Sequence, residues 1–398
     1  MLVDRVLRDL DLPDPDERGG NPLRGSRLGR CARQSAYMLY PKAYPPDPLP
    51  ARAKLVFRFG DMIHEMVRAE FRRVVPGEWG MEEERFHLRV ELTVKETEAA
   101  LALLHTGALN GTVQDGATLR AFNGPLALRG WRVAIVPEHR RGLWLDVSEP
   151  ALYVPLHVDG IADLEPFGGE GLASVEIKSM ATGSFRRAVQ GQVDYAYRVQ
   201  MAAAVDATGL DTEMYVAVRK DTCHLLEVIY TKKAAEVSVT FTKMSHLSTA
   251  LGLSLEDGAD WEGAEVRHPF EPHLLDQARA RVRRILRATV TNLPEREYGP
   301  DFTCGTCQGT GTQVKAKNTG LPLKRGPKPC EDCERTLEGL GLPSGLLARA
   351  ELPFQCRYCP FPIHCWPQAK LEIEDERPHL WITRQDYEAS GVTFHGPE

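Results

Sequence analysis

The stretch YVPLHVDGIADLEPFGGEGLASVEIKSM, residues 153–180, predicts two β-strands joined by a glycine-rich turn at residues 167–171. In the second strand the residue types alternate, which is the pattern of a strand with two different faces. Because side chains of a strand point alternately to opposite faces, Glu176 and Lys178 share one face and Val175 and Ile177 share the other. An acid and a base on one face of an otherwise apolar strand indicate either a functional site or a cross-strand ion pair on a solvated face.

The first strand of this pair carries two acidic candidates, Asp159 and Asp163, which have the same parity and so the same face. Hard divalent cations such as Mg²⁺ and Mn²⁺ take oxygen ligands from neighbouring elements, and a pair of carboxylates on adjacent strands supplies them. We favour Asp159 as the partner of Glu176 because the following Gly160 permits a close approach of backbone and ligand. Asp163 is the second choice.

Elements on both sides of this hairpin complete a fold prediction. Residues 54–71 have the apolar spacing of an amphipathic helix, on which Gly60 and His64 lie one turn apart. Residues 185–205 predict a second helix with Gln200 on it, and residues 213–230 predict two more strands joined by a Lys-Asp-Thr turn. The order strand, strand, helix, strand, strand favours an α/β (α+β) fold, with a central mixed sheet flanked by helices.

The nine cysteines predict two metal centres. Cys223 lies in the strand-like CHLLEVIY and is expected to be a small buried apolar residue. Two CxxC pairs separated by 22 residues are typical of a zinc knuckle, and a further four thiols would tie the two ends of the chain together. The zinc set is Cys304, Cys307, Cys330 and Cys333, and the second set is Cys31, Cys356, Cys359 and Cys365.

These motifs together resemble the PD-(D/E)XK nuclease superfamily. A distant first cysteine in SRLGRCARQSAYMLY and the later CRYCPFPIHCWP resemble its iron-sulfur branch, which includes the RecB and AddB nuclease domains, the CRISPR-associated Cas-four-type exonucleases and their phage relatives. The resemblance implies a restriction-endonuclease-like core and a [4Fe-4S] cluster on the second cysteine set. It also implies metal ligation by His64, Asp159, Glu176 and the carbonyl of Ile177, a water-orienting Lys178, and Gln200 beside the site.

The function that follows from this resemblance is metal-dependent exonuclease cleavage of DNA, on single strands or duplex ends, in recombination, repair or phage DNA metabolism. Two alternatives stay open: an accessory nuclease subunit of CRISPR adaptation, and a non-enzymatic iron-sulfur and zinc scaffold that binds DNA. A recombination or adaptation protein is the expected partner class, and an oligomer is neither favoured nor excluded.

Composition adds the compartment and the domain plan. The formal net charge of −6 gives no global case for nucleic-acid binding, and neither an apolar leader nor a membrane-spanning run is present, so we expect a cytoplasmic protein that does not enter membranes. The expected divisions are an N-terminal segment with the first cluster cysteine (1–50), a nuclease core with a β-rich insertion at about 75–150 (51–235), a helical region (236–300), a zinc knuckle (301–345) and an iron-sulfur segment (346–398).

Overall fold

The chain divides into two compact units, each assembled from two separate stretches of sequence. The first contains Met1–Arg30 and Pro50–Arg287, and the second contains Cys31–Leu49 and Ala288–Glu398. The structure, a computed structural model, describes residues 21–47, 51–80, 82, 85–114, 142–240, 264–295, 312–313, 328–329, 347–351, 356, 359–366, 370–374 and 377–383.

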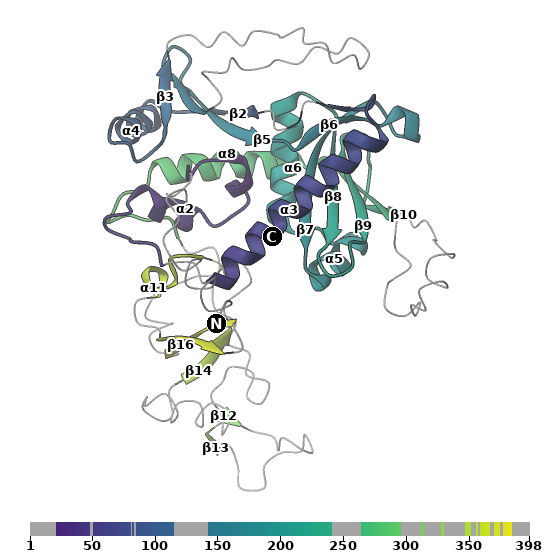
Figure 1. Cartoon of the computed structure of the whole chain (residues 1–398). Helices are drawn as coiled ribbons and strands as arrows, with labels where there is room; N and C mark the ends of the chain where they lie inside the picture. Colours follow the sequence, from purple (N-terminus) through teal and green to yellow (C-terminus); the bar gives the residue numbers. More distant parts are fainter. Residues whose placement is uncertain are drawn as a thin grey trace, which may run out of the picture. The chain divides into compact units, whose positions relative to one another are not determined.

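The first unit is built on a seven-stranded mixed sheet flanked by helices, which confirms the predicted α/β class (Figure 1). The two strands of the predicted hairpin, β6 and β7, pair antiparallel, β7 and β8 pair parallel, and β8 and β9 pair antiparallel. In sheet order the strands are β1 (Trp79–Gly80), β6 (Gly160–Asp163), β7 (Leu172–Met180), β8 (Thr212–Arg219), β9 (Leu225–Thr231), β11 (Ala264–Pro269) and β10 (Ser238–Thr240).

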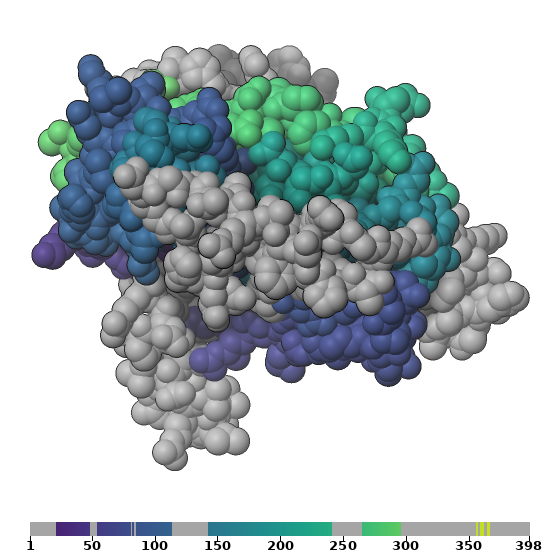
Figure 2. All heavy atoms as spheres, turned by 90° about the horizontal axis from the view of Figure 1, so that it is seen from above, coloured from purple at the N-terminus to yellow at the C-terminus, as the bar shows by residue number. Residues whose placement is uncertain are grey.

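Helix α3 (Ala51–Val74) covers one face of this sheet (Figure 1). Its Ile63 and Val67 are buried in a cluster with the inward side chains of β7 and β8, such as Val175 and Ile177. The apolar stripe expected on this helix is therefore only partly a core stripe. Its other members, including Met62, stay exposed where α3 runs along the molecular surface (Figure 2).

The opposite face of the sheet is covered by α6 (Tyr195–Thr208), which contacts β7, β8 and β9. The single helix expected over residues 185–205 is in fact two, because α5 (Thr182–Val189) ends before Gly191, whose φ is +80°. Asp194 then caps the start of α6 by accepting a hydrogen bond from the Ala196 N–H at 2.9 Å. The interruption resets the direction of the chain, so that α6 lies against the sheet.

A second sheet of four strands supplies the expected β-rich insertion. Its order is β2 (Arg85–Glu91), β5 (Ala151–His157), β4 (Leu143–Asp146) and β3 (Gly111–Gln114), and α4 (Val94–His105) lies between β2 and β3 in sequence. β5 belongs to this sheet and β6 to the central one, so the strand expected from residue 153 onward is broken at Val158 and Asp159. The chain changes sheets at that break. Two 3-10 turns, Gly25–Arg27 and Glu165–Phe167, complete the first unit.

The region expected to be helical, residues 236–300, contributes strands as well. β10 and β11 pair antiparallel with each other, and β11 pairs parallel with β9, which extends the central sheet. Val266 and His268, two residues apart on β11, are both buried. This period of two is typical of a strand, and the sequence prediction overlooked it. Helix α8 (Pro272–Leu286) is the helical part, and its Arg279 binds Asp206 on α6 at 2.9 Å.

The second unit has helices α2 (Ala32–Leu39) and α11 (Pro362–Cys365). A three-stranded sheet in the order β14 (Leu347–Glu351), β16 (Arg377–Thr383) and β15 (Lys370–Glu374) accompanies them. The two-residue strands β12 (Thr312–Gln313) and β13 (Lys328–Pro329) pair antiparallel between the two CxxC pairs in sequence.

Candidate functional site

Asp159 lies at the break between β5 and β6, where its side chain binds the backbone of β7 just beyond the end of the β6–β7 pairing. The register pairs Gly160 with Val175, so β6 covers β7 only from Leu172 to Val175. At the next inward position the Ile177 N–H donates to Asp159 Oδ2 at 2.6 Å, in place of a strand partner. The carboxylate is thereby fixed beside the part of β7 that carries the predicted site.

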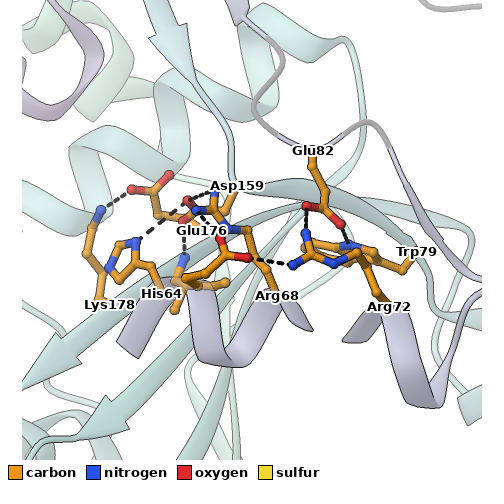
Figure 3. Close-up of polar contacts among 10 residues, drawn as sticks. His64, Arg68, Arg72, Trp79, Glu82, Asp159, Glu176 and Lys178 are labelled. Carbon is orange, nitrogen blue, oxygen red and sulfur yellow. Dashed lines mark hydrogen bonds and ion pairs between the residues drawn. The ribbon is translucent and has the colours of Figure 1, made fainter. Parts of the chain in front are cut away.

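Two side chains of α3 reach the same carboxylate (Figure 3). His64 Nδ1 lies 3.6 Å from Asp159 Oδ1, and Arg68 Nη1 lies 3.9 Å from the same atom. Gly60, one turn before His64, permits this approach, because a Cβ there would lie only 3.2 Å from Ser179 Oγ on β7. The helix therefore delivers His64 to the sheet as its spacing predicted.

These contacts keep Asp159 ionised. Burial by itself would raise the pKa of this carboxyl. The nearby His64 imidazole and the hydrogen bond from the Ile177 N–H outweigh burial, so the pKa of Asp159 lies below its ordinary value. A buried carboxylate that stays charged is a suitable ligand for a hard cation.

Glu176 and Lys178 point to the same face of β7, as the period-two alternation predicted, and their side chains form an ion pair (Figure 3). Only 10% of the Glu176 side chain and 18% of the Lys178 side chain are exposed. Burial would lower the pKa of the Lys178 ammonium, but the Glu176 carboxylate more than offsets it, so that pKa is raised. Lys178 is a cation at neutral pH.

The structure places the other two predicted residues differently. Asp163 is opposite Leu172 in the β6–β7 register, about 13 Å along the strand from the position opposite Glu176. Its carboxylate accepts a hydrogen bond from the Glu165 N–H at 3.1 Å and so shapes the turn after β6. Gln200 is buried on α6, on the side of the sheet to which Glu176 points.

The Trp79 ring accounts for the glycine at position 160, directly after Asp159. A Cβ on Gly160 would lie 2.3 Å from the Trp79 ring, so the close approach that this glycine allows is that of an indole. The Trp79 Nε1–H donates to Glu82 at 2.5 Å, and Glu82 forms an ion pair with Arg72 on α3 (Figure 3). This corrects the expectation that Gly160 makes room for a ligand.

Glu213 on β8 is a site neighbour that the sequence reasoning missed. It lies opposite Ser174, whose hydroxyl donates a hydrogen bond to its carboxyl group. Burial raises the pKa of Glu213 well above its ordinary value; the Ser174 hydroxyl lowers it, and the Glu176 carboxylate raises it further. The alternation in TEMYVAVR, which puts Glu213 and Tyr215 on the face opposite Met214 and Val216, was the available signal.

The four thiols of the second cysteine set belong to one unit. Cys31 precedes α2, and Cys356, Cys359 and Cys365 lie around α11. Burial raises the pKa of the Cys356 thiol, and the neighbouring Cys31, Cys359 and Cys365 act in the same direction, which shows that the four lie near one another.

Direct protein contacts join the two stretches of the second unit near these cysteines. The Tyr37 hydroxyl on α2 donates to the His364 carbonyl at 3.0 Å, and the Tyr37 ring packs against Phe361 with 5.2 Å between centroids. The Asp47 N–H donates to the Pro360 carbonyl at 2.7 Å. The two ends of the second unit therefore meet at the cysteines, as the spacing predicted.

Cys223 differs from its expected environment. It is exposed rather than buried, and it lies in the turn before β9 with a φ of +57°. Its N–H donates to the Arg219 carbonyl at 2.8 Å, so the turn, and not the following strand, determines its position.

Within the part of the chain that the structure describes, no three His, Cys, Asp or Glu side chains are already arranged to hold a metal ion. The predicted zinc ligands Cys304, Cys307, Cys330 and Cys333 lie outside the described residues. Surface hollows of about 290 and 830 Å³ share Glu170, Thr212 and Lys233, near the ends of β7 and β8 away from Lys178. In the described helices, no segment is both long enough and apolar enough to span a bilayer.

Comparisons with known proteins add little to this picture. No protein-family model matches the chain, and no curated protein matches it. A solved structure entitled "Crystal structure of SSO0001" aligns with 58% of this chain and 78% of its own, at 11% sequence identity and a TM-score of 0.30. A likeness of that size carries no argument, so the case for function depends on the side chains.

Proposed function

We propose that this protein is a metal-dependent deoxyribonuclease of the PD-(D/E)XK type that removes nucleotides from single-stranded DNA or DNA ends. The observation that carries the proposal is the convergence of His64, Asp159, Glu176 and Lys178 from α3, the β5–β6 break and β7. Such a set of two carboxylates, an imidazole and an ammonium group has the composition required for phosphodiester hydrolysis.

The donor set suits a hard divalent cation. His64, Asp159, Glu176 and the carbonyl of Ile177 would hold Mg²⁺ or Mn²⁺, since carboxylate and carbonyl oxygens are the ligands these ions prefer. Such an ion would supply Lewis acidity at the phosphate and increase the acidity of water. The ion pair with Lys178 involves Oε1 of Glu176, so Oε2 of the same carboxylate would be available to the ion.

The chain's own residues then have separate roles. Lys178, a cation within reach of Glu176, would stabilise negative charge that develops on the phosphate and orient the attacking water. Asp159 stays ionised beside His64, and its hydrogen bond from the Ile177 N–H fixes the position of its carboxylate. Gln200 on α6, on the side of the sheet to which Glu176 points, would lie beside the bound DNA.

The cysteines would serve structure rather than chemistry. Cys31, Cys356, Cys359 and Cys365 would hold a [4Fe-4S] cluster, a fit that their proximity and thiol chemistry support. The CxxC pairs would hold Zn²⁺. Iron content and visible absorbance of anaerobically purified protein test the cluster: Cys356→Ser should lose both, and Cys223→Ser, which changes an exposed cysteine that is not a member of the set, should keep both.

The activity is tested with end-labelled single-stranded and duplex DNA in Mg²⁺ or Mn²⁺. We expect the wild type to release nucleotides and Glu176→Ala to lose about a hundredfold or more of this activity, since a residue that binds the metal directly is worth more than one that only orients a ligand. Glu170→Ala is the matched control, because Glu170 is an exposed glutamate paired with Lys233. If no DNA form is cut in either metal, the nuclease proposal fails and the scaffold alternative takes its place. A co-purifying integrase would instead favour the CRISPR adaptation alternative.

A further inference from the structure

Several basic side chains that are not among the proposed metal ligands lie near Asp159. Arg68 on α3 has only 13% of its side chain exposed, and its guanidinium lies 3.9 Å from Asp159 (Figure 3). On the other side of the strand break, His157 ends β5 and is directly opposite Arg85 on β2. Directly opposed residues of an antiparallel pair have Cβ atoms about 5 Å apart, so Arg85 and His157 lie side by side.

Electrostatics joins these groups into one neighbourhood. His157 interacts with Asp159, Glu176, Arg85 and Arg68, which come from four different elements. Acidic and guanidinium groups therefore lie around the same strand break.

Two acidic residues near Arg68 are shared with other groups. Its Nη2 lies 3.0 Å from Glu65, but the Glu65 carboxylate is 57% exposed and also binds Arg72 at 2.6 Å. With Asp159 and Glu176 committed to a divalent cation, as the proposed function requires, the basic side chains are in excess. A second anion is then favoured beside the metal, and guanidinium groups bind phosphate oxygens in a planar, two-point geometry.

We propose that Arg68, Arg85 and His157 form a phosphate-binding rim that holds the nucleic-acid backbone next to the bond to be cut. The proposal rests on the proposed function for the nature of its ligand. The ligand class is a phosphodiester strand, because the three side chains offer N–H donors to phosphate oxygens. The rim would fix the register of the strand on the site and carry no sequence preference.

The test separates DNA binding from cleavage. Binding of a fluorescein-labelled single-stranded oligothymidylate to the full chain is followed by anisotropy in Ca²⁺, without Mg²⁺ or Mn²⁺, over a series of salt concentrations. Each phosphate contact that is lost should reduce the slope of log Kobs against log salt by about 0.7 for a single strand. We expect Arg68→Ala and Arg85→Ala each to reduce the slope by this amount and to weaken binding about tenfold, the cost of one charged hydrogen bond.

Controls fix the interpretation. Arg73→Ala changes an arginine of the same helix whose side chain is 70% exposed and bound to Glu70, and it should leave affinity and slope unchanged. Arg68→Lys keeps the charge and should restore the slope. If Arg68→Ala fails to fold, as judged by its thermal transition, Arg85→Ala on the exposed end of β2 still decides the question.

The outcomes distinguish this inference from the proposed function. Wild type that binds with the expected slope but cuts no DNA in Mn²⁺ would refute the nuclease and leave the rim. The rim would be refuted, and the nuclease left standing, if the wild type cuts DNA while both alanine variants bind DNA with an affinity within twofold of the wild type. Weaker binding by both variants at an unchanged salt slope would have the same meaning. Wild type that binds no DNA would refute the rim directly.

Discussion

Replacement of Gly60 tests the contact on which the candidate site depends, the approach of α3 to β7. A Cβ at this position would lie 3.2 Å from Ser179 Oγ, a few tenths of an ångström closer than ordinary contact. Ser179 is half-buried and its hydroxyl can rotate away, so one added carbon fits after a small adjustment. A longer side chain has no such space between the helix and the strand.

The magnitudes follow from two opposing effects. Alanine gains about 1 kcal/mol over glycine in a helix interior, and the tight contact offsets part of this gain, so Gly60→Ala should be between neutral and slightly stabilising. Gly60→Leu adds three further carbons against β7, and overpacking of this kind costs about 1–3 kcal/mol. The same displacement would draw Ile63 and Val67 out of their cluster and His64 away from Asp159.

Urea unfolding followed by far-ultraviolet circular dichroism measures the effect. Midpoints are compared, because a chain of two units need not unfold in one step. With a slope of about 3 kcal/mol per molar urea, a loss of 1–3 kcal/mol lowers the midpoint by about 0.3–1 M. Gly183→Ala on α5 is the matched control, since nothing lies within 4 Å of a Cβ there. A Gly60→Leu midpoint equal to that of the wild type would show that α3 does not lie against β7 at Ser179.

Three further predictions concern single groups. Glu213 has a raised pKa, so its contribution to stability is present below its unfolded pKa of about 4.5 and is lost as pH rises through the folded value. Glu213→Gln should therefore gain stability over the wild type as pH rises from 4.5 to 8, and parallel urea midpoints over that range would contradict the burial of a carboxyl group. Asp159 has a lowered pKa, so its contribution is present above about 3.8 and is lost as pH falls through the folded value; Asp159→Asn should show a shallower loss of stability in acid, by the same measurement. Cys223→Gly should raise the free energy of unfolding by about 1 kcal/mol, because glycine accepts the φ of +57° without strain; a lower melting temperature than that of the wild type would contradict this.

Local sequence patterns determined much of the site. The alternation of residues 172–178 fixed which side chains of β7 face together, because a strand's period of two depends on nothing beyond the strand itself. The four-residue spacing of Gly60 and His64 placed the imidazole one turn from a close helix–sheet contact for the same reason. The partition of the cysteines stays a prediction; the structure adds that Cys31 and the three C-terminal cysteines belong to one unit.

Tertiary structure decided what local periods leave open. Asp159 and Asp163 have equal parity, and only the register of β6 on β7, together with the chain's change of sheets at residue 159, puts one carboxylate beside Glu176 and the other at the far end of the strand. Glu213 became a neighbour of the site because β8 pairs parallel with β7, and such a pairing joins residues that no sequence window contains. The environment of Cys223 was predicted wrongly because the β8–β9 pairing, and not the start of the apolar sequence, decides where the turn ends and β9 begins. The sequence alone thus determined which side chains share a face, while the position of each face in the fold was decided by contacts between residues far apart in the chain.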